Sequence, residues 1–132
     1  MIKIGIIGCG GIANNKHMPA LAKVEAAEMV AFCDIIEERA SKAREAFGTD
    51  AANVYTDYME LLKDDEIDVI HVCTPNISHA EISIAAMESG KHVMCEKPMA
   101  KTSEEAEAMI AAMNRTGKKL TIGYQNRFRK DS

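Results

Sequence analysis

The feature that most constrains the fold is an apolar run that meets a cluster of glycines near the start of the chain. Residues 3–7 (KIGII) are apolar without alternation, as is typical of a parallel strand covered on both faces. The run continues directly into GCGGIA at 8–13. A helical pattern over 12–24 follows, and Pro19 should break or offset its middle. The start of the chain therefore predicts a strand, a sharp glycine turn and a helix.

Short β-rich runs alternate with helical patterns along the rest of the chain. Further strands are expected at 28–34, 68–74, 92–96 and 120–124, with a weak one at 53–55, and helices at 37–47, 58–63, 78–89 and 103–117. The last helix is expected to begin at Ser103, which lacks the Glu or Gln three residues later that completes a capping box. The connections are too long for hairpins, so the strands should run parallel. The sequence predicts an α/β fold, a doubly wound and mostly parallel six-stranded Rossmann sheet with helices on both faces.

Size and charge exclude several classes of protein. The 132 residues suit one domain, and 16 Lys and Arg against 20 Asp and Glu leave a net charge of −4. A mildly acidic chain is a poor match to nucleic acid or to an anionic membrane. The longest apolar run, 4–13, is shorter than the roughly 20 residues that span a bilayer. Strand-like sequence from Ile2 leaves no room for a signal peptide. We therefore expect a soluble, cytoplasmic protein with no nucleic-acid or membrane partner.

The four cysteines, Cys9, Cys33, Cys73 and Cys95, give no sign of a metal site. They form no CxxC pair, and no histidine lies at a zinc-finger spacing from them. Each lies at or just after the end of an expected strand. We expect small buried thiols in a reducing compartment rather than a disulfide framework.

The glycine turn also predicts a ligand. GCGGIA has the GxGxxA form of the dinucleotide fingerprint, in which Gly8 permits the turn, Gly10 lets backbone amides approach a pyrophosphate, and Ala13 packs helix against strand. Asp34 ends the second strand 21 residues after Ala13, close to the usual spacing of about 20. Its carboxylate suits ribose hydroxyls and would repel a 2′-phosphate, which favours NAD over NADP. The candidate cofactor-binding residues of the turn are Gly8, Gly10, Gly11, Ile12 and Ala13. The alternatives are an ordinary turn with a surface aspartate, or a site for a nucleoside-bearing methyl donor.

Polar residues follow the strand at 68–74, where ligands of open α/β sheets bind. Thr74 and Asn76 offer a hydroxyl and an amide to a ribose or nicotinamide, and His79, soon after, is a further candidate cofactor-binding residue. The alternative is that Asn76 or Ser78 caps the next helix and that His79 is exposed in its first turn. His71, inside the strand, is interpreted as a structural histidine.

The next strand ends in Glu96-Lys97-Pro98. Glu96 can hold a ribose, and Lys97 can reach a substrate oxygen beside the nicotinamide. An unperturbed lysine has a pKa of about 10.4, which desolvation and a positive nicotinamide would both lower towards that of a general base. The alternative is a solvent-facing ion pair.

With these motifs assembled, the chain resembles the N-terminal half of the Gfo/Idh/MocA oxidoreductases (glucose–fructose oxidoreductase, inositol dehydrogenase and relatives). The resemblance runs over 3–128 and is most specific at Glu96-Lys97-Pro98. It implies NAD or NADP binding and oxidation or reduction of a hydroxyl-bearing carbon in a sugar, a cyclitol or a similar metabolite. It also implies that Lys97 is catalytic and contacts both the nicotinamide ribose and the reacting hydroxyl, and that Glu96 and Thr74 help to position the nicotinamide.

The resemblance further implies a division of the protein. Residues 1–125 would form the dinucleotide-binding domain, and 126–132 would begin the connection to a substrate domain outside this chain. That domain would hold most substrate contacts and the main interface of a homo-oligomer, so this chain alone is expected to be inactive. A non-enzymatic, dinucleotide-sensing module is the alternative function. A methyltransferase is disfavoured because Ile6 and Ile7 occupy the stretch where an acidic residue is expected.

Overall fold

The computed structural model describes residues 1–11, 13–74, 78–96 and 102–123. Within these residues, six strands form a sheet in the order β3-β2-β1-β4-β5-β6, and every neighbouring pair is parallel. The strands are β1 (Ile2–Ile7), β2 (Ala27–Cys33), β3 (Gly48–Tyr55), β4 (Val69–Val72), β5 (His92–Glu96) and β6 (Leu120–Gly123). The predicted doubly wound α/β sheet is confirmed.

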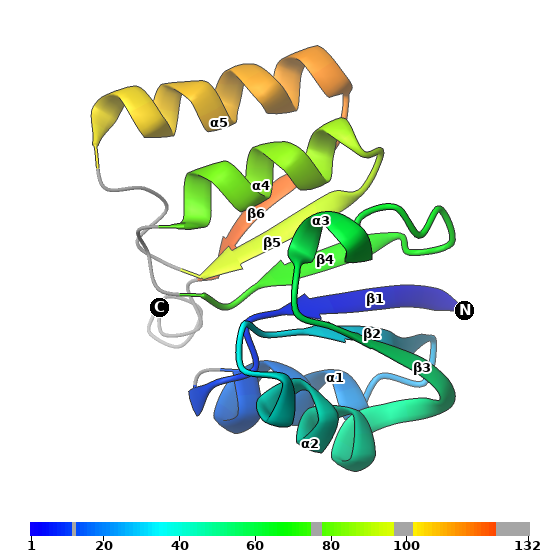
Figure 1. The fold of residues 1–132 in the computed structure, drawn as a ribbon. Helices are drawn as coiled ribbons and strands as arrows, with labels where there is room; N and C mark the ends of the chain where they lie inside the picture. Colours follow the sequence, from blue (N-terminus) through cyan, green and yellow to red (C-terminus); the bar gives the residue numbers. More distant parts are fainter. Residues whose placement is uncertain (12, 75–77, 97–101, 124–132) are drawn as a thin grey trace, which may run out of the picture.

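Helices cover both faces of this sheet (Figure 1). One layer holds η1 (Ala13–His17), a π-helical segment, with α1 (Met18–Ala22) and α2 (Glu37–Phe47). The other holds α3 (Tyr58–Leu61), α4 (His79–Glu88) and α5 (Ser103–Thr116). Among the described helices, none combines the length and the apolar character that crossing a membrane requires.

The two layers explain why the first strand is apolar without alternation. Ile6 packs with Met18 and Phe32 in the core under α1 and α2. Its neighbour Ile7 packs with Ile70 in the core under α3, α4 and α5. Because successive side chains of a strand point to opposite faces, a strand with a core on each side needs apolar residues at every position.

The helix over 12–24 differs most from a regular helix. The chain first forms the π-helical segment η1, and α1 begins only at Met18. Pro19 follows η1 almost directly, and the backbone of His17 is helical, so the departure from α-helical geometry lies in the turn just before the proline. The expected offset of the helix near Pro19 is therefore confirmed.

Two boundaries differ from the sequence prediction. β3 begins at Gly48 rather than at 53, because the Arg44 guanidinium donates to the Ala52 and Asp50 carbonyls, both at 2.6 Å, and holds this stretch beside α2.

α5 is capped by Thr102 rather than Ser103: the Thr102 hydroxyl accepts from the Glu105 amide at 3.1 Å. Glu105 lies three residues after Thr102, at the spacing of a capping box, whereas the expected start at Ser103 lacked one.

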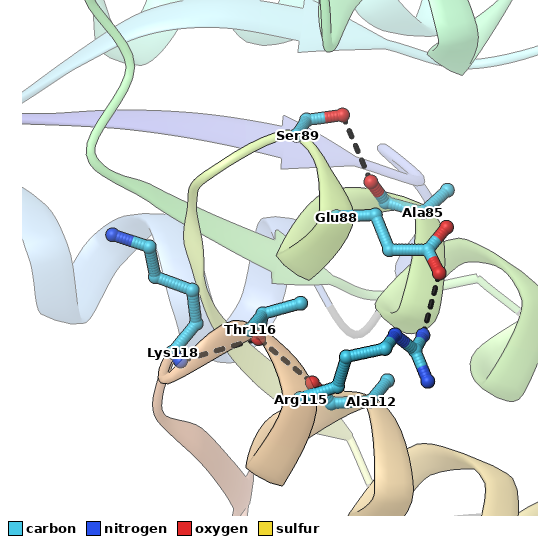
Figure 2. A network of polar contacts seen from close by, with 7 residues as sticks. All are labelled: Ala85, Glu88, Ser89, Ala112, Arg115, Thr116 and Lys118. Carbon is cyan, nitrogen blue, oxygen red and sulfur yellow. Dashed lines mark hydrogen bonds and ion pairs between the residues drawn. The ribbon is translucent and has the colours of Figure 1, made fainter.

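α4 and α5 lie side by side, and an ion pair joins them near their C-terminal ends (Figure 2). The Arg115 guanidinium donates to the Glu88 carboxylate at 2.5 Å, and both side chains are about half exposed. At the end of α5 itself, the Thr116 hydroxyl donates to the Ala112 carbonyl and accepts from the Lys118 amide. Such exposed contacts contribute little, roughly 0–1 kcal/mol for the ion pair, so the helices are held mainly by the apolar core beneath them.

Candidate functional site

A cavity of about 600 Å³ opens at the carboxyl edge of the sheet. It lies over the ends of β1, β2 and β4, and β1 and β4 flank the point where the strand order reverses. Ligands of open α/β sheets bind at such a switch point. The lining residues are Ile7, Gly8, Gly10, Gly11, Cys33, Asp34, Ile35, Arg39, Thr56, Tyr58, Cys73, Thr74, Ser78, Glu81 and Ile82.

The glycine turn has two different steric requirements. Gly8 has a φ of 95°, and a Cβ there would lie 2.7 Å from the Cys73 carbonyl carbon and the Thr74 nitrogen. A side chain at Gly8 would therefore strain the backbone and collide with the end of β4. At Gly10 the nearest heavy atom to an added Cβ is the Arg39 Nη1, 4.0 Å away. The space above Gly10 belongs to the cavity and leaves the turn open to a ligand.

The turn packs onto the sheet through Ala13. This residue is fully buried, in the same core cluster as Ile6. Its predicted packing of helix against strand is confirmed, whereas a direct contact with a cofactor stays a prediction. Ile12 lies outside the described residues.

Asp34 is held at the turn by backbone amides on both sides. Its Oδ2 accepts from the Cys9 amide at 2.8 Å and its Oδ1 from the Ile36 amide at 2.9 Å. The residue is 8% exposed, so it is not the surface aspartate of the alternative interpretation. Each carboxylate oxygen has lone-pair capacity for a further donor. The site therefore presents a fixed anion beside the glycines, able to accept from two adjacent hydroxyls.

The end of β4 presents a hydroxyl without a partner. The Thr74 Oγ1 is buried, and within the described residues it has no hydrogen-bond partner. Thr74 lines the cavity. Because buried polar atoms are almost always paired, an unpaired hydroxyl in a cavity wall points to a ligand or an ordered water. Asn76, its predicted companion, lies outside the described residues.

His79 supports Thr74 rather than lining the cavity. Its ring is 1% exposed, and its Nε2 lies 2.7 Å from the Thr74 carbonyl oxygen, to which it donates. The alternative of a His79 exposed in the first helical turn is therefore wrong. Capping by Ser78 is also wrong: this residue precedes α4, but its side chain makes no capping hydrogen bond to the helix. A contact of His79 with a cofactor stays a prediction.

A buried histidine pair escaped the sequence analysis. The Nδ1 atoms of His17 and His71 lie 2.9 Å apart, and the two rings meet edge to face. Burial and the neighbouring His17 lower the pKa of His71 to about 4. The structural role expected for His71 is confirmed. No local signal marked its partner, since the two residues are 54 positions apart.

Two thiols near the cavity, those of Cys9 and Cys33, are not nucleophiles. Burial, with Asp34 close by, raises the pKa of both Cys9 and Cys33 to about 12, so they stay protonated at neutral pH. All four cysteines carry thiols rather than disulfides, and three of them are buried. In the described part of the chain, no group of three or more His, Cys, Asp or Glu side chains is arranged to hold a metal ion.

The strand that ends in Glu96 reaches the same edge of the sheet. Glu96 is the last residue of β5 and pairs with Gly123 of β6. Because the strands are parallel, this end lies at the edge where Gly8, Asp34 and Thr74 line the cavity. Lys97, which follows, lies outside the described residues, as do Pro98 and the predicted boundary near 125.

The position of the glycine turn and its anchored carboxylate at the switch point defines a Rossmann-type dinucleotide-binding domain. Residues 2–124 match the GFO_IDH_MocA family, described as an oxidoreductase family with an NAD-binding Rossmann fold. The chain belongs to this family and corresponds to its NAD-binding domain.

Named relatives agree with this assignment. The chain is 36% identical over 131 residues to the inositol 2-dehydrogenase of Salmonella paratyphi B, a match that covers 98% of the chain and 38% of that enzyme. A scyllo-inositol dehydrogenase from Lactobacillus casei, solved with NAD(H) and scyllo-inositol, superposes with a TM-score of 0.88 at 26% identity, over 97% of this chain and 37% of that one. A 3-ketoreductase from Actinomadura kijaniata, solved with NADP and TDP-benzene, superposes with a TM-score of 0.85 at 32% identity, over 92% and 37%. The chain thus spans less than half the length of the proteins it matches.

Proposed function

We propose that this chain is the cofactor-binding part of an NAD-dependent dehydrogenase. Its substrate would be a sugar, a cyclitol or a similar metabolite, oxidised or reduced at a hydroxyl-bearing carbon. The observation that carries the proposal is the Asp34 carboxylate, fixed by the Cys9 and Ile36 amides at the mouth of a cavity bordered by the glycine turn. The polyol-acting relatives support the substrate class.

Each part of the cavity suits one part of a nicotinamide dinucleotide. The backbone of Gly8, Gly10 and Gly11 would hold the pyrophosphate, because no side chain separates it from the cavity. Asp34 would accept from the adenosine ribose hydroxyls. Thr74, whose buried hydroxyl is unsatisfied among the described residues, would gain a partner at the nicotinamide end. When bound, the dinucleotide supplies the hydride acceptor or donor.

The residues at the end of β5 would complete the chemistry. Glu96 would hold the nicotinamide ribose, and Lys97 would move the proton of the reacting hydroxyl. The remaining substrate contacts, and the interface of a homo-oligomer, would come from a second domain of the kind that makes the relatives longer. This chain alone would then bind cofactor without turnover.

Cofactor binding is tested with NADH on the chain itself, by fluorescence titration or calorimetry. Asp34→Ala should weaken binding by roughly 10- to 100-fold, because it removes hydrogen bonds to a charged acceptor worth about 1.5–3 kcal/mol. Asp64→Ala is the matched control: Asp64 also accepts a backbone amide, from Glu66 at 3.0 Å, but lies at the opposite edge of the sheet. A folded chain with no affinity for NADH, shown to be folded by circular dichroism, would contradict the proposal.

Turnover is tested on the full polypeptide in which this sequence occurs, by following NADH absorbance with a panel of polyols and sugars. Lys97→Met should abolish turnover while leaving NADH affinity within a few-fold of its original value. Binding of NADH without oxidation of any substrate in the panel would favour the dinucleotide-sensing alternative.

A further inference from the structure

The cavity wall at the end of β4 extends beyond the hydrogen bonds of the sheet. The Cys73 amide donates to the Ile7 carbonyl at 2.8 Å, and within the described residues this is the last bond that ties β4 to β1. Thr74 comes next, and its buried hydroxyl, without a partner in the same residues, belongs to the cavity wall. The position of this hydroxyl therefore depends on a contact made outside the sheet.

His79 makes such a contact with the backbone of Thr74. Its Nε2 lies 2.7 Å from the Thr74 carbonyl oxygen. Because a carbonyl can only accept, Nε2 carries the proton and donates. The His79 ring is 1% exposed and is not among the residues that line the cavity. The ring can therefore influence a bound ligand through Thr74, without touching the ligand itself.

α4 gives His79 a fixed position. His79 is the first residue of this helix, and the neighbouring Ala80 and Ile82 are buried in one core cluster with Val72 of β4. The hydrogen bond thus joins the Thr74 carbonyl to a helix that is itself packed on the sheet. Because the peptide unit is planar, a fixed carbonyl restricts the rotation of the Thr74 backbone and hence the direction of its side chain.

We propose that His79 is a positioning residue for cofactor binding, which holds the Thr74 carbonyl so that the Thr74 hydroxyl meets the nicotinamide half of the dinucleotide. The inference rests on the proposed function, because it assumes that a dinucleotide occupies the cavity. A hydroxyl already held in place loses little freedom when the ligand binds, so more of its hydrogen bond is retained as affinity. Without the His79 donor, binding must also supply the ordering of Thr74.

The experiment is a double-mutant cycle on Kd for NADH, measured on the chain itself. His79→Leu, which removes the donor, should weaken binding about three- to tenfold. His79→Gln should restore affinity to within about twofold of the wild type, because the Gln amide nitrogen can take the place of Nε2. In a Thr74→Val background, His79→Leu should add less than about a twofold loss, since the hydroxyl through which it acts is gone.

A second ligand separates positioning of Thr74 from general loosening of the cavity. ADP carries the adenosine and the diphosphate but neither the nicotinamide nor its ribose. His79→Leu should therefore leave the Kd for ADP within about twofold of the wild-type value. His92→Leu is the matched control, because His92 also bonds to the backbone, at the Lys119 amide, but starts β5 at the opposite edge of the sheet. It should change neither Kd.

Circular dichroism establishes that each variant is folded. If His79→Leu does not fold, His79→Asn replaces it, because the shorter amide cannot reach the Thr74 carbonyl from the same backbone position. Three results would overturn the inference while leaving the proposed function intact: unchanged NADH affinity in the variant without the donor, equal losses for NADH and ADP, or losses from His79 and Thr74 that multiply in the double variant. Failure of the folded wild-type chain to bind NADH would instead refute the proposed function, and the inference with it.

Discussion

The buried pair of His17 and His71 predicts that the stability of the domain falls in mild acid. The hydrogen bond between their Nδ1 atoms, 2.9 Å apart, needs one nitrogen that carries a proton and one that does not. A second proton would set two N–H groups against each other in a site where His71 is only 8% exposed. Lowering the pH is therefore a perturbation aimed at this contact.

The size of the effect follows from the pKa of His71, which burial and His17 lower from 6.5 to about 4. Between these values the unfolded chain binds a proton at His71 and the native chain does not, so acid favours the unfolded state. The stabilisation is complete above about pH 6.5 and is lost as the pH falls towards 4. At about 1.4 kcal/mol for each pH unit, the loss is about 2 kcal/mol at pH 5 and about 3 kcal/mol at pH 4. This is a large share of the 5–15 kcal/mol typical of a domain.

The assay is urea unfolding, followed by circular dichroism between about pH 7 and pH 5. His71→Asn is the diagnostic variant, because its amide lies near the position of Nδ1, can bond to His17 and does not titrate. We expect its free energy of unfolding to lose less with acid than that of the wild type, by about 2 kcal/mol at pH 5. His92→Asn, at a half-buried histidine of β5, controls for the substitution itself. Equal pH slopes for His71→Asn and the wild type would refute the reasoning.

Two further predictions concern the cavity wall. Gly8→Ala should destabilise the domain by about 3 kcal/mol in urea unfolding, through a positive φ and a clash with the end of β4, whereas Gly90→Ala, at a similar φ of 89° with nothing within 4 Å, should cost only about 1 kcal/mol. An equal loss of unfolding free energy in Gly8→Ala and Gly90→Ala would contradict the predicted clash with β4. Thr74→Val should leave the stability of the cofactor-free chain unchanged or raise it by up to about 1 kcal/mol, since the hydroxyl has no partner among the described residues, and should weaken NADH binding several-fold in a fluorescence titration. A marked loss of stability in Thr74→Val would instead reveal a structural role for the hydroxyl.

Most of the fold was predictable because its determinants are local. The unbroken apolar runs marked the buried strands, and the helices end where expected, before Gly48, Gly90 and Gly117. The first half of β3 was not predictable, because GTDAA at 48–52 has little strand-forming character. That stretch is held by the Arg44 contacts and by pairing with β2, which are tertiary effects. In the sequence alone, Arg44 is one of several charged residues of a helix, and nothing marks its contacts with β3.

The candidate site also combines residues that local sequence predicts with residues whose role depends on tertiary contacts. Gly8 and Asp34 were found because the strand–turn–helix unit fixes their spacing, whatever the rest of the chain does. The burial of His79, the pairing of His17 with His71 and the burial of Lys91 depend on residues that meet only after folding. The Lys91 ammonium, in a residue 1% exposed, donates to the Leu62 carbonyl across 29 positions of the chain. A lysine is expected on the surface from its residue type, and the burial of Lys91 is explained only by the position of the Leu62 carbonyl in the fold.

The hydrogen bond from the Cys9 amide to Asp34 makes the glycine turn and the acidic residue one unit rather than two neighbouring motifs. Removing the carboxylate frees an amide inside the turn as well as losing a ribose contact, so any loss of affinity in Asp34→Ala combines the two effects. NADH and NADPH share the pyrophosphate and the adenine, and disorder of the turn weakens both alike. The ratio of their affinities cancels that common loss and retains only what happens at the 2′ position. It follows that the ratio should move towards NADPH in Asp34→Ala, and this shift identifies the adenosine end of the cavity more securely than the affinity for NADH alone.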